Sequence, residues 1–236
     1  MFERRIDMPY FYWYDSTYVL VIIAFLLSLF ASFGVKATFS KYAKVTNHSG
    51  LTGSMAARKI LDMNGLYHIK VERVSGDLTD HYDPKADVIR LSESVFDSAS
   101  VAAVGVAAHE AGHAVQHAKN YAPIKVRNAL VPIVNISTSL SMPLFVIGLI
   151  LSMTGLALLG VILFSTALLF QIVTLPVEFD ASRRAIKILS SGNLMYEDEV
   201  RGARKVLSAA AMTYVAGAAA TALQLLRLLL ILRRDD

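Results

Sequence analysis

Two histidines four residues apart, with a glutamate beside the first, are the residues best suited to chemistry in this chain. They occur in the segment His109-Glu110-Ala111-Gly112-His113. On a helix, residues four apart share a face, so both imidazoles can bind one metal ion while Glu110 reaches a water molecule beside it. Zinc lowers the pKa of such a water toward ~7, and glutamate then acts as general base. The motif predicts a zinc peptidase site with His109 and His113 as ligands and Glu110 as the base.

A third zinc ligand can be sought by elimination, because a catalytic zinc ion usually has three protein ligands and one open position. The chain has no cysteine, and its six histidines all lie at or before His117. Between the motif and residue 196 the only acidic residues are Glu178 and Asp180. We expect Glu178 to be the ligand. Asp180 is expected either to hold a ligand in place or to begin a helix.

Several residues near the motif are candidates for substrate binding. His117 lies one helical turn beyond His113 and could orient substrate, although a solvated histidine at a helix end is the simpler interpretation. His81 is expected to be a loop residue that lines the cleft. The oxyanion of the reaction needs an electrophilic partner. The candidates for that role are His117, Tyr214, Arg183 and Arg184, of which the arginines also suit anchoring at a membrane surface.

The composition indicates that a lipid bilayer surrounds much of the chain. Hydrophobic residues make up 55% of the 236 residues and charged residues 18%, whereas soluble globular proteins have about 25% charged residues. The net charge of +4 is typical of basic loops beside anionic lipid. No dense run of basic residues with interleaved aromatics favours nucleic-acid binding. We therefore expect an integral membrane protein with no nucleic-acid partner.

Three long apolar runs predict four transmembrane helices. The first and last runs each have the length of one span, whereas the middle run is uncharged over fifty residues, which suits a hairpin of two spans. A hairpin returns the chain to the membrane face that it left, so Glu178 can meet His109 there. The runs cover residues 16–35, 128–177 and 206–232, and the hairpin helices are expected near 131–152 and 155–175.

The basic residues near the predicted spans indicate the orientation, because such residues gather on the cytoplasmic side. Twelve of them lie in or beside residues 36–127 and 176–205, and only four, with acidic neighbours, lie near the two termini. We therefore expect the active site on the cytoplasmic side and both termini outside.

The segment 36–127 is expected to be a small α+β domain at the membrane face. Thr52 predicts the start of a helix near 53–63. Alternating residues predict a strand over 68–74 and a shorter strand over 88–91. Asp97 or Ser98 is expected to cap the helix that carries the motif and ends near residue 118. The fold class predicted is a mainly α membrane protein with four transmembrane helices and this small domain.

The predicted organisation has five parts. Residues 1–35 form an N-terminal segment and first transmembrane helix, 36–127 the domain with the histidine motif, and 128–177 the transmembrane hairpin. Residues 178–205 form the third-ligand segment with a helix, and 206–236 the last transmembrane helix with a tail.

Several segments resemble one known family. Leu78-Thr79-Asp80-His81-Tyr82-Asp83-Pro84, AAHEAGHAVQ, LVPIVN and PVEFDAS are similar to the YugP-like neutral zinc metallopeptidases of bacterial membranes, and the resemblance covers nearly the whole chain. More distantly, the chain is similar to the HtpX and CAAX prenyl protease group, which are gluzincins with a distal glutamate. The resemblance implies a zincin-like domain, a bacterial cell membrane and Glu178 as third ligand.

The resemblance leaves two features of the site open. The distal motif of the HtpX group is E-[FY]-x-A-D, and this chain has Glu178-Phe179-Asp180-Ala181-Ser182. Ser182 therefore replaces the final acid, and Asp180 is a candidate to take over its contact. The resemblance also implies that the strand over 88–91 lies along the cleft, where it either pairs with an extended substrate or is only a structural edge strand.

These observations predict a zinc metalloendopeptidase with one catalytic zinc ion, which hydrolyses polypeptides or membrane-protein segments. An intramembrane-cleaving protease is an alternative, but Asp97 and Lys119 lie too close to the motif for a helix within the bilayer. A scaffold or regulatory subunit with a structural metal is a further alternative, against which the presence of Glu110 argues. An oligomer or a regulatory partner stays open.

Overall fold

The computed structural model describes residues 16–233, so residues 1–15 and 234–236 of the predicted terminal segments lie outside the description. The described part is mainly helical with one three-stranded sheet. In chain order its elements are α1 (Tyr18–Ala43), α2 (Gly53–Met63), β1 (Lys70–Val74), β2 (His81–Asp83), β3 (Val88–Ser92), α3 (Glu93–Phe96), α4 (Val101–Ala118), α5 (Ala122–Ile150), α6 (Thr154–Ser191) and α7 (Glu197–Leu232).

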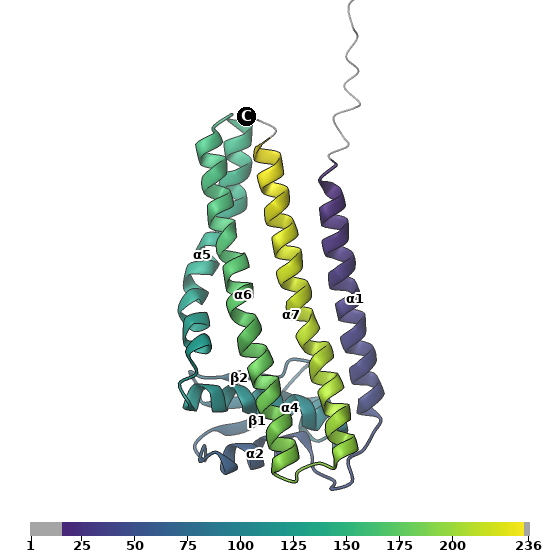
Figure 1. Cartoon of the computed structure of the whole chain (residues 1–236). Coiled ribbons are helices and arrows are strands. Elements are labelled where there is room, and N and C mark those ends of the chain that lie inside the picture. Colours follow the sequence, from purple (N-terminus) through teal and green to yellow (C-terminus); the bar gives the residue numbers. More distant parts are fainter. Residues whose placement is uncertain (1–15, 234–236) are drawn as a thin grey trace, which may run out of the picture.

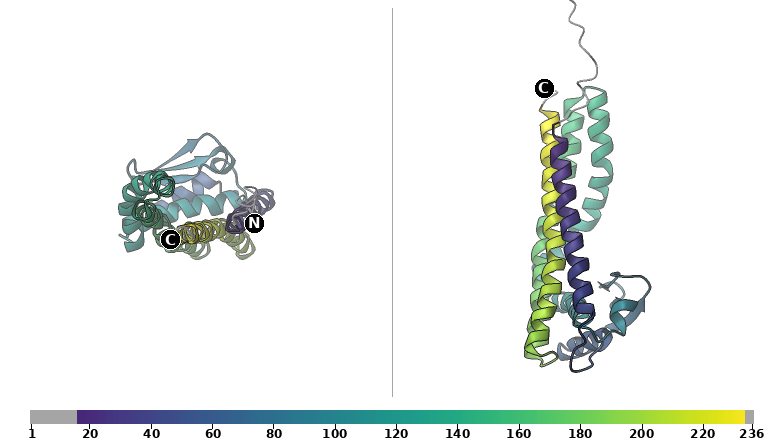
Figure 2. Two further views of the ribbon diagram at one scale, coloured as in Figure 1. Left: turned by 90° about the horizontal axis from the view of Figure 1, so that it is seen from above. Right: turned by 90° about the vertical axis from the view of Figure 1, so that its right-hand side faces the viewer.

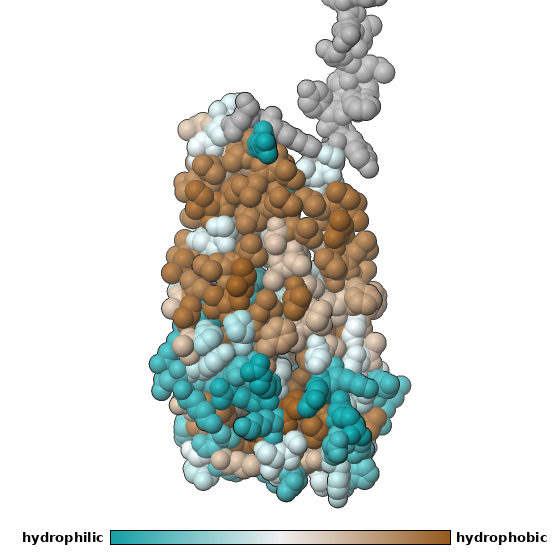
Figure 3. Space-filling view, in the orientation of Figure 1, coloured by the Kyte–Doolittle hydropathy of each residue, from teal (hydrophilic) through white to brown (hydrophobic). Residues whose placement is uncertain are grey.

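Four long helices, α1, α5, α6 and α7, run side by side as a bundle (Figure 1). All four are long and apolar enough to cross a membrane, which confirms the predicted number of candidate spans. Hydrophobic residues cover one end of the bundle, and hydrophilic residues cover the other (Figure 3). The start of α1 and the end of α7 lie together at the hydrophobic end, opposite the sheet (Figure 1).

Helices α6 and α7 are longer than a bilayer requires. They contain 38 and 36 residues, and at 1.5 Å per residue each is roughly 55 Å long, against about 30 Å of hydrocarbon. Helix α6 therefore continues without a break through Glu178 and Asp180 to Ser191. The predicted end of the second hairpin helix near residue 175 was wrong, and so was the alternative in which Asp180 begins a helix. The loss of hydrophobicity after residue 177 marks where the helix leaves the apolar region, not where it ends.

The small domain lies beside the hydrophilic end of the bundle, and its sheet and α2 project to one side (Figure 2). Strand β3 is central in the order β1-β3-β2; it pairs in parallel with β1 and antiparallel with β2. Its side chains Ile89 and Leu91 are fully buried and pack with Ile60 and Leu61 of α2. The expectation of an edge strand over 88–91 was wrong, because β2 covers that edge. Residue His81 begins β2 and is not in a loop.

Side-chain hydrogen bonds from capping residues determine where α2 and α4 begin. The Thr52 hydroxyl accepts a hydrogen bond from the Met55 amide at 3.3 Å, so α2 begins as predicted. Helix α4 is capped instead by Ser100, whose hydroxyl accepts from the Ala103 amide at 3.2 Å. Asp97 and Ser98 do not cap it, because Asp97 forms an ion pair with Arg73 and the Ser98 hydroxyl donates to that of Ser100.

Candidate metal centre

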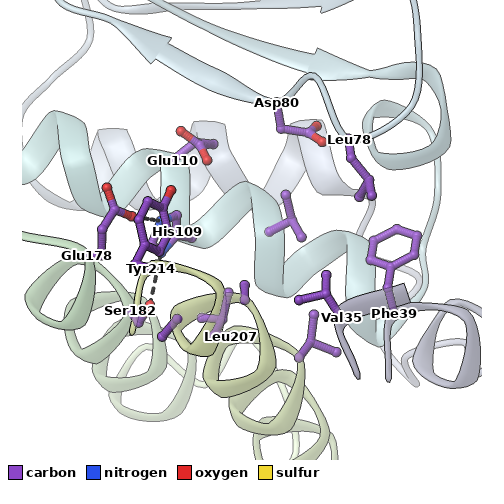
Figure 4. Close-up of a pocket in the computed structure, with 14 residues that line it drawn as sticks. Val35, Phe39, Leu78, Asp80, His109, Glu110, Glu178, Ser182, Leu207 and Tyr214 are labelled. Atoms are coloured by element: carbon purple, nitrogen blue, oxygen red, sulfur yellow. Dashed lines mark hydrogen bonds and ion pairs between the residues drawn. The ribbon is translucent and has the colours of Figure 1, made fainter. Parts of the chain in front are cut away.

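Helices α4 and α6 bring the three predicted ligands together. His109 and His113 lie on one face of α4, with their ring centroids 4.7 Å apart, and Glu178 approaches from α6. Glu178 Oε2 lies 3.3 Å from His109 Nε2 and 3.6 Å from His113 Nε2. One ligand atom from each residue falls within 4.8 Å of the others. The residues could therefore hold a metal ion between them; Figure 4 shows two of them, His109 and Glu178, beside each other.

The donor set fits zinc. Two atoms at about 2.1 Å from a tetrahedral ion are roughly 3.4 Å apart, which agrees with the two distances to Glu178 Oε2. That oxygen is buried and, although close to both imidazoles, accepts no hydrogen bond from a residue within 16–233. Burial opposes a charge on His113, but its contact with Glu178 and the charge of Glu110 raise its pKa above the ordinary value. The site thus favours a cation between these side chains.

Hydrogen bonds behind the ligands orient both imidazoles. Ser182 Oγ lies 3.1 Å from His109 Nδ1, and Gln116 Oε1 lies 3.0 Å from His113 Nδ1. The amide of Gln116 donates to the Val177 carbonyl at 2.8 Å, so its oxygen is left to face the ring. A proton on each Nδ1 leaves both Nε2 atoms with lone pairs directed toward Glu178, which is the arrangement that a metal needs.

Asp180 contacts Gln116, which in turn contacts His113. Its Oδ2 accepts from Gln116 Nε2 at 2.9 Å and from Arg184 Nε at 2.5 Å. Asp180 therefore acts on His113 through Gln116, whereas the contact with His109 belongs to Ser182. The serine that replaces the expected acid is in contact with the first histidine after all.

Gly112 allows α4 to approach α6 closely enough to complete the site. A Cβ atom at this position would lie 2.7 Å from the carbonyl oxygen of Ala181, which belongs to the backbone of α6. Ala181 is one turn beyond Glu178, so the contact fixes the height of Glu178 against the two histidines. The small residues inside the motif thus serve helix packing as well as open space at the metal.

Glu110 faces the open side of the site. Glu110 is buried, with only 8% of its surface exposed. It lines two cavities that meet at the predicted metal position. The same two cavities are also lined by Asp80, which immediately precedes β2, and by Tyr214 from α7. Figure 4 shows both residues in the wall of one of these cavities. A base at this point can contact a molecule that enters from either cavity.

The remaining predicted residues do not all line the cavities at the metal position. His81 and His117 line one of the two cavities, and burial lowers the pKa of His117, as do the charges of His113 and Arg127. Arg184 donates to Asp180 and lies over the ring of Tyr121, at 5.5 Å from its centroid. Arg183 is exposed and lines a separate groove. Neither arginine lines the two cavities at the metal position.

Four residues at the site were not identified from the sequence. Gln116 and Asn128 have neither charge nor a motif to mark them. Asp80 accepts hydrogen bonds from the amide and hydroxyl of Ser92, at 2.8 and 3.1 Å, and so ties the start of β2 to the end of β3. Burial nevertheless raises the pKa of Asp80. Arg127 was counted only as a basic residue near a span.

Comparisons with known proteins agree with this geometry. A family model described as "Putative neutral zinc metallopeptidase" matches residues 17–233. The chain is 49% identical over 212 residues to the "Putative membrane protease YugP" of Bacillus subtilis (strain 168), and the match covers 90% of this chain and 94% of that relative. No solved structure matches the chain significantly.

Proposed function

The chain belongs to this family of neutral zinc metallopeptidases, and we propose that it is a membrane-embedded zinc metalloendopeptidase of the gluzincin type. The family implies zinc. The observation that carries the proposal is the buried Glu178 Oε2, which meets two imidazole nitrogens across two helices. His109, His113 and Glu178 would hold one catalytic zinc ion, and the small domain would be zincin-like.

When bound, zinc supplies a Lewis acid that polarises the scissile carbonyl and lowers the pKa of a water molecule. Glu110 takes the proton from the attacking water and passes it to the leaving amine. Its position between the two cavities supports both steps, because the peptide would cross the site from one cavity to the other.

Tyr214 is our candidate for stabilising the oxyanion. It lines both cavities together with Glu110 and Glu178, and a phenol hydroxyl is a suitable donor to a developing negative charge. Arg183 and Arg184 line neither cavity, so they are better suited to the membrane surface. His117 lies in one cavity and would contact the substrate beyond the reacting bond.

Strand β2 is the strand on which an extended substrate would pair. It forms one edge of the described sheet, and its residues His81 and Tyr82 line a cavity at the metal position. A peptide added to this edge would gain main-chain hydrogen bonds and pass directly over Glu110. This replaces β3, which is paired on both sides, as the substrate-binding strand.

The site would lie at the cytoplasmic face of a bacterial cell membrane, with both termini outside. The relative is named a membrane protease, and the charge distribution of the sequence favours this orientation. The small domain lies at the hydrophilic end of the bundle (Figure 3), which favours a membrane-face site over cleavage deep within the bilayer.

The proposal is tested with full-length protein in detergent, by measuring bound zinc and the cleavage of casein. Glu110→Gln should keep zinc and lose activity by roughly 10²- to 10⁴-fold, and Glu178→Ala should lose most of both. Glu197→Gln is the matched control, because Glu197 is exposed on α7. Cleavage by Glu110→Gln at the wild-type rate would overturn the mechanism. Stoichiometric zinc without cleavage of any substrate would favour the scaffold.

A further inference from the structure

The two cavities at the metal position have opposite chemical character. They share only five lining residues, namely Asp80, His109, Glu110, Glu178 and Tyr214. The first cavity, of about 200 Å³, is otherwise closed mainly by apolar side chains of α1, α4 and α7. These include Val106, Val206 and Ala210, together with Val35, Phe39 and Leu207, which Figure 4 labels.

The second cavity, of about 300 Å³, has a polar far end. His81 and Tyr82 of β2, His117 of α4, and Arg127 and Asn128 of α5 contribute to its wall. The polar groups here already interact with one another in part, since Asn128 Nδ2 lies 3.4 Å from His117 Nε2. A guanidinium group stays charged at all physiological pH values, so Arg127 is the permanent cation among the residues that line this end of the cavity.

Arg127 differs from the three other arginines of the small domain and from Arg184 of α6. Arg58, Arg73, Arg90 and Arg184 each form an ion pair with an aspartate. Within residues 16–233, no carboxylate lies within 4 Å of the Arg127 guanidinium, and its Nε atom is buried without a hydrogen-bond partner. A buried donor of this kind costs free energy unless an oxygen atom satisfies it.

We propose that Arg127 binds a carboxylate of the substrate, while the apolar cavity takes a hydrophobic side chain from the other side of the scissile bond. A guanidinium group matches a carboxylate with two parallel hydrogen bonds, which makes it selective for this group. The carboxylate would come from an acidic side chain or from the C-terminus of the peptide. This inference rests on the proposed function, because the two cavities flank the site of hydrolysis.

The first arm of the test measures hydrolysis by the full-length, zinc-loaded protein. Cleavage sites in casein supply a starting peptide with a bulky apolar residue beside the scissile bond. Three versions of this peptide are compared. The first has Glu beyond the scissile bond and the second has Gln there, and both have an amidated C-terminus. The third has Gln at that position and a free C-terminal carboxylate close to the bond. Wild-type protein should prefer one carboxylate version over the amide by roughly 10- to 100-fold in kcat/KM, and the preferred version identifies the source.

Variants at Arg127 then test whether this residue causes the preference for a carboxylate peptide. Arg127→Gln should cleave the carboxylate and amide peptides at similar rates, mainly through a higher KM for the carboxylate peptide. Arg127→Lys keeps the charge without the paired donors and should retain part of the preference. Lys125→Gln is the matched control, because it removes an exposed positive charge two residues away on α5. It should behave as wild type.

The second arm separates this inference from the proposed function, because it needs no hydrolysis. Fluorescence anisotropy measures binding of the same peptides to Glu110→Gln, with and without Arg127→Gln. Tighter binding of a carboxylate peptide, lost on Arg127→Gln, would support the inference even if no peptide were cleaved. Equal binding of acid and amide peptides would overturn it, as would an equal loss for both in Arg127→Gln.

Discussion

Helices α4 and α1 are both rich in apolar residues, but they bury them in opposite ways. In α4, 13 of the 18 residues are buried within the protein, and most of these are Ala, Gly and Val. In α1, only Ala31 of the 26 residues is buried, and Phe30 is 81% exposed. Small residues let α4 lie close to its neighbours, whereas the large side chains of α1 suit a surface covered by lipid.

The comparison explains where the metal site can form. A site needs helices held at fixed distances, and α4 provides this at Gly112, where a Cβ atom would lie 2.7 Å from the α6 backbone, whereas nothing lies within 4 Å of a Cβ atom at Gly34 of α1. Helix α6 belongs to both environments, because its first part is exposed and apolar and its last part packs against α4. Glu178 lies in this last part, so a candidate membrane-spanning helix carries the proposed third ligand into a region packed against α4.

The largest difference between α4 and α1 is expected when a glycine of each helix is replaced by alanine. In Gly112→Ala the new Cβ would lie 2.7 Å from the Ala181 carbonyl oxygen, so α6 must move and carry Glu178 away from the histidines. We expect zinc affinity and hydrolysis to fall by about 100-fold or more, since an error of about 1 Å can have that effect on an active site. Zinc-buffered titration and casein cleavage measure both.

Gly34→Ala on α1 is the matched control for this substitution. Nothing lies within 4 Å of a Cβ atom at Gly34, and alanine favours a helix by about 1 kcal/mol over glycine. We expect unchanged zinc binding and an equal or higher melting temperature. If Gly112→Ala bound zinc as tightly as Gly34→Ala, the close approach of α4 and α6 would not be what positions Glu178.

A smaller effect is expected behind the first histidine. Ser182→Ala removes the hydroxyl 3.1 Å from His109 Nδ1, so the ring loses the contact that fixes its orientation. Zinc affinity should fall by roughly 10-fold or somewhat more, and Ser182→Asp, which restores an acceptor, should bind zinc at least as tightly as wild type. Ser190→Ala, at an exposed position on the same helix, should leave the affinity unchanged. Equal affinities for Ser182→Ala and Ser190→Ala would remove Ser182 from the site.

The sequence predicted the three candidate ligands because their placement depends on simple geometry. His109 and His113 share a helix face by spacing, and elimination together with a two-span hairpin selects Glu178. The same arguments could not predict the contacts of Asp180 and Ser182, which depend on the rotation of α6 against α4. Helix α6 does not end near residue 175 as expected but continues through Glu178. This continuous helix places the side chains of Asp180 and Ser182 in contact with α4.

Other features were missed for identifiable reasons. Strand β2 has three residues, His81-Tyr82-Asp83, which is too short and too polar for an alternating pattern to reveal it. It exists because β3 offers it a free edge, a tertiary effect. Arg127 looks like any basic residue beside a membrane span, and only the packing of α5 against the small domain places it in a cavity.

The smallest effect concerns a half-buried carboxylate in β2. Asp83 accepts hydrogen bonds from the Lys85 amide at 2.9 Å, from Arg90 at 3.1 Å and from the Ala86 amide at 3.3 Å, and these contacts lower its pKa below the ordinary 3.8. A lowered pKa contributes stability above the unfolded value and loses it as the pH falls through the folded value. Asp80, three residues earlier, has a raised pKa because it is buried, so its contribution has the opposite sign.

Asp83→Asn should therefore be slightly less stable than wild type at pH 6, and the difference should shrink toward zero as the pH falls below 3.8. The effect is small because solvent screens the ion pair with Arg90. Denaturant unfolding of both proteins in detergent, with a chelator present so that zinc release does not contribute, measures the difference at each pH. A difference that stayed constant from pH 6 to pH 3 would show that β2 is held by its pairing with β3 alone, and that the charge of Asp83 has no part in positioning the strand over the site.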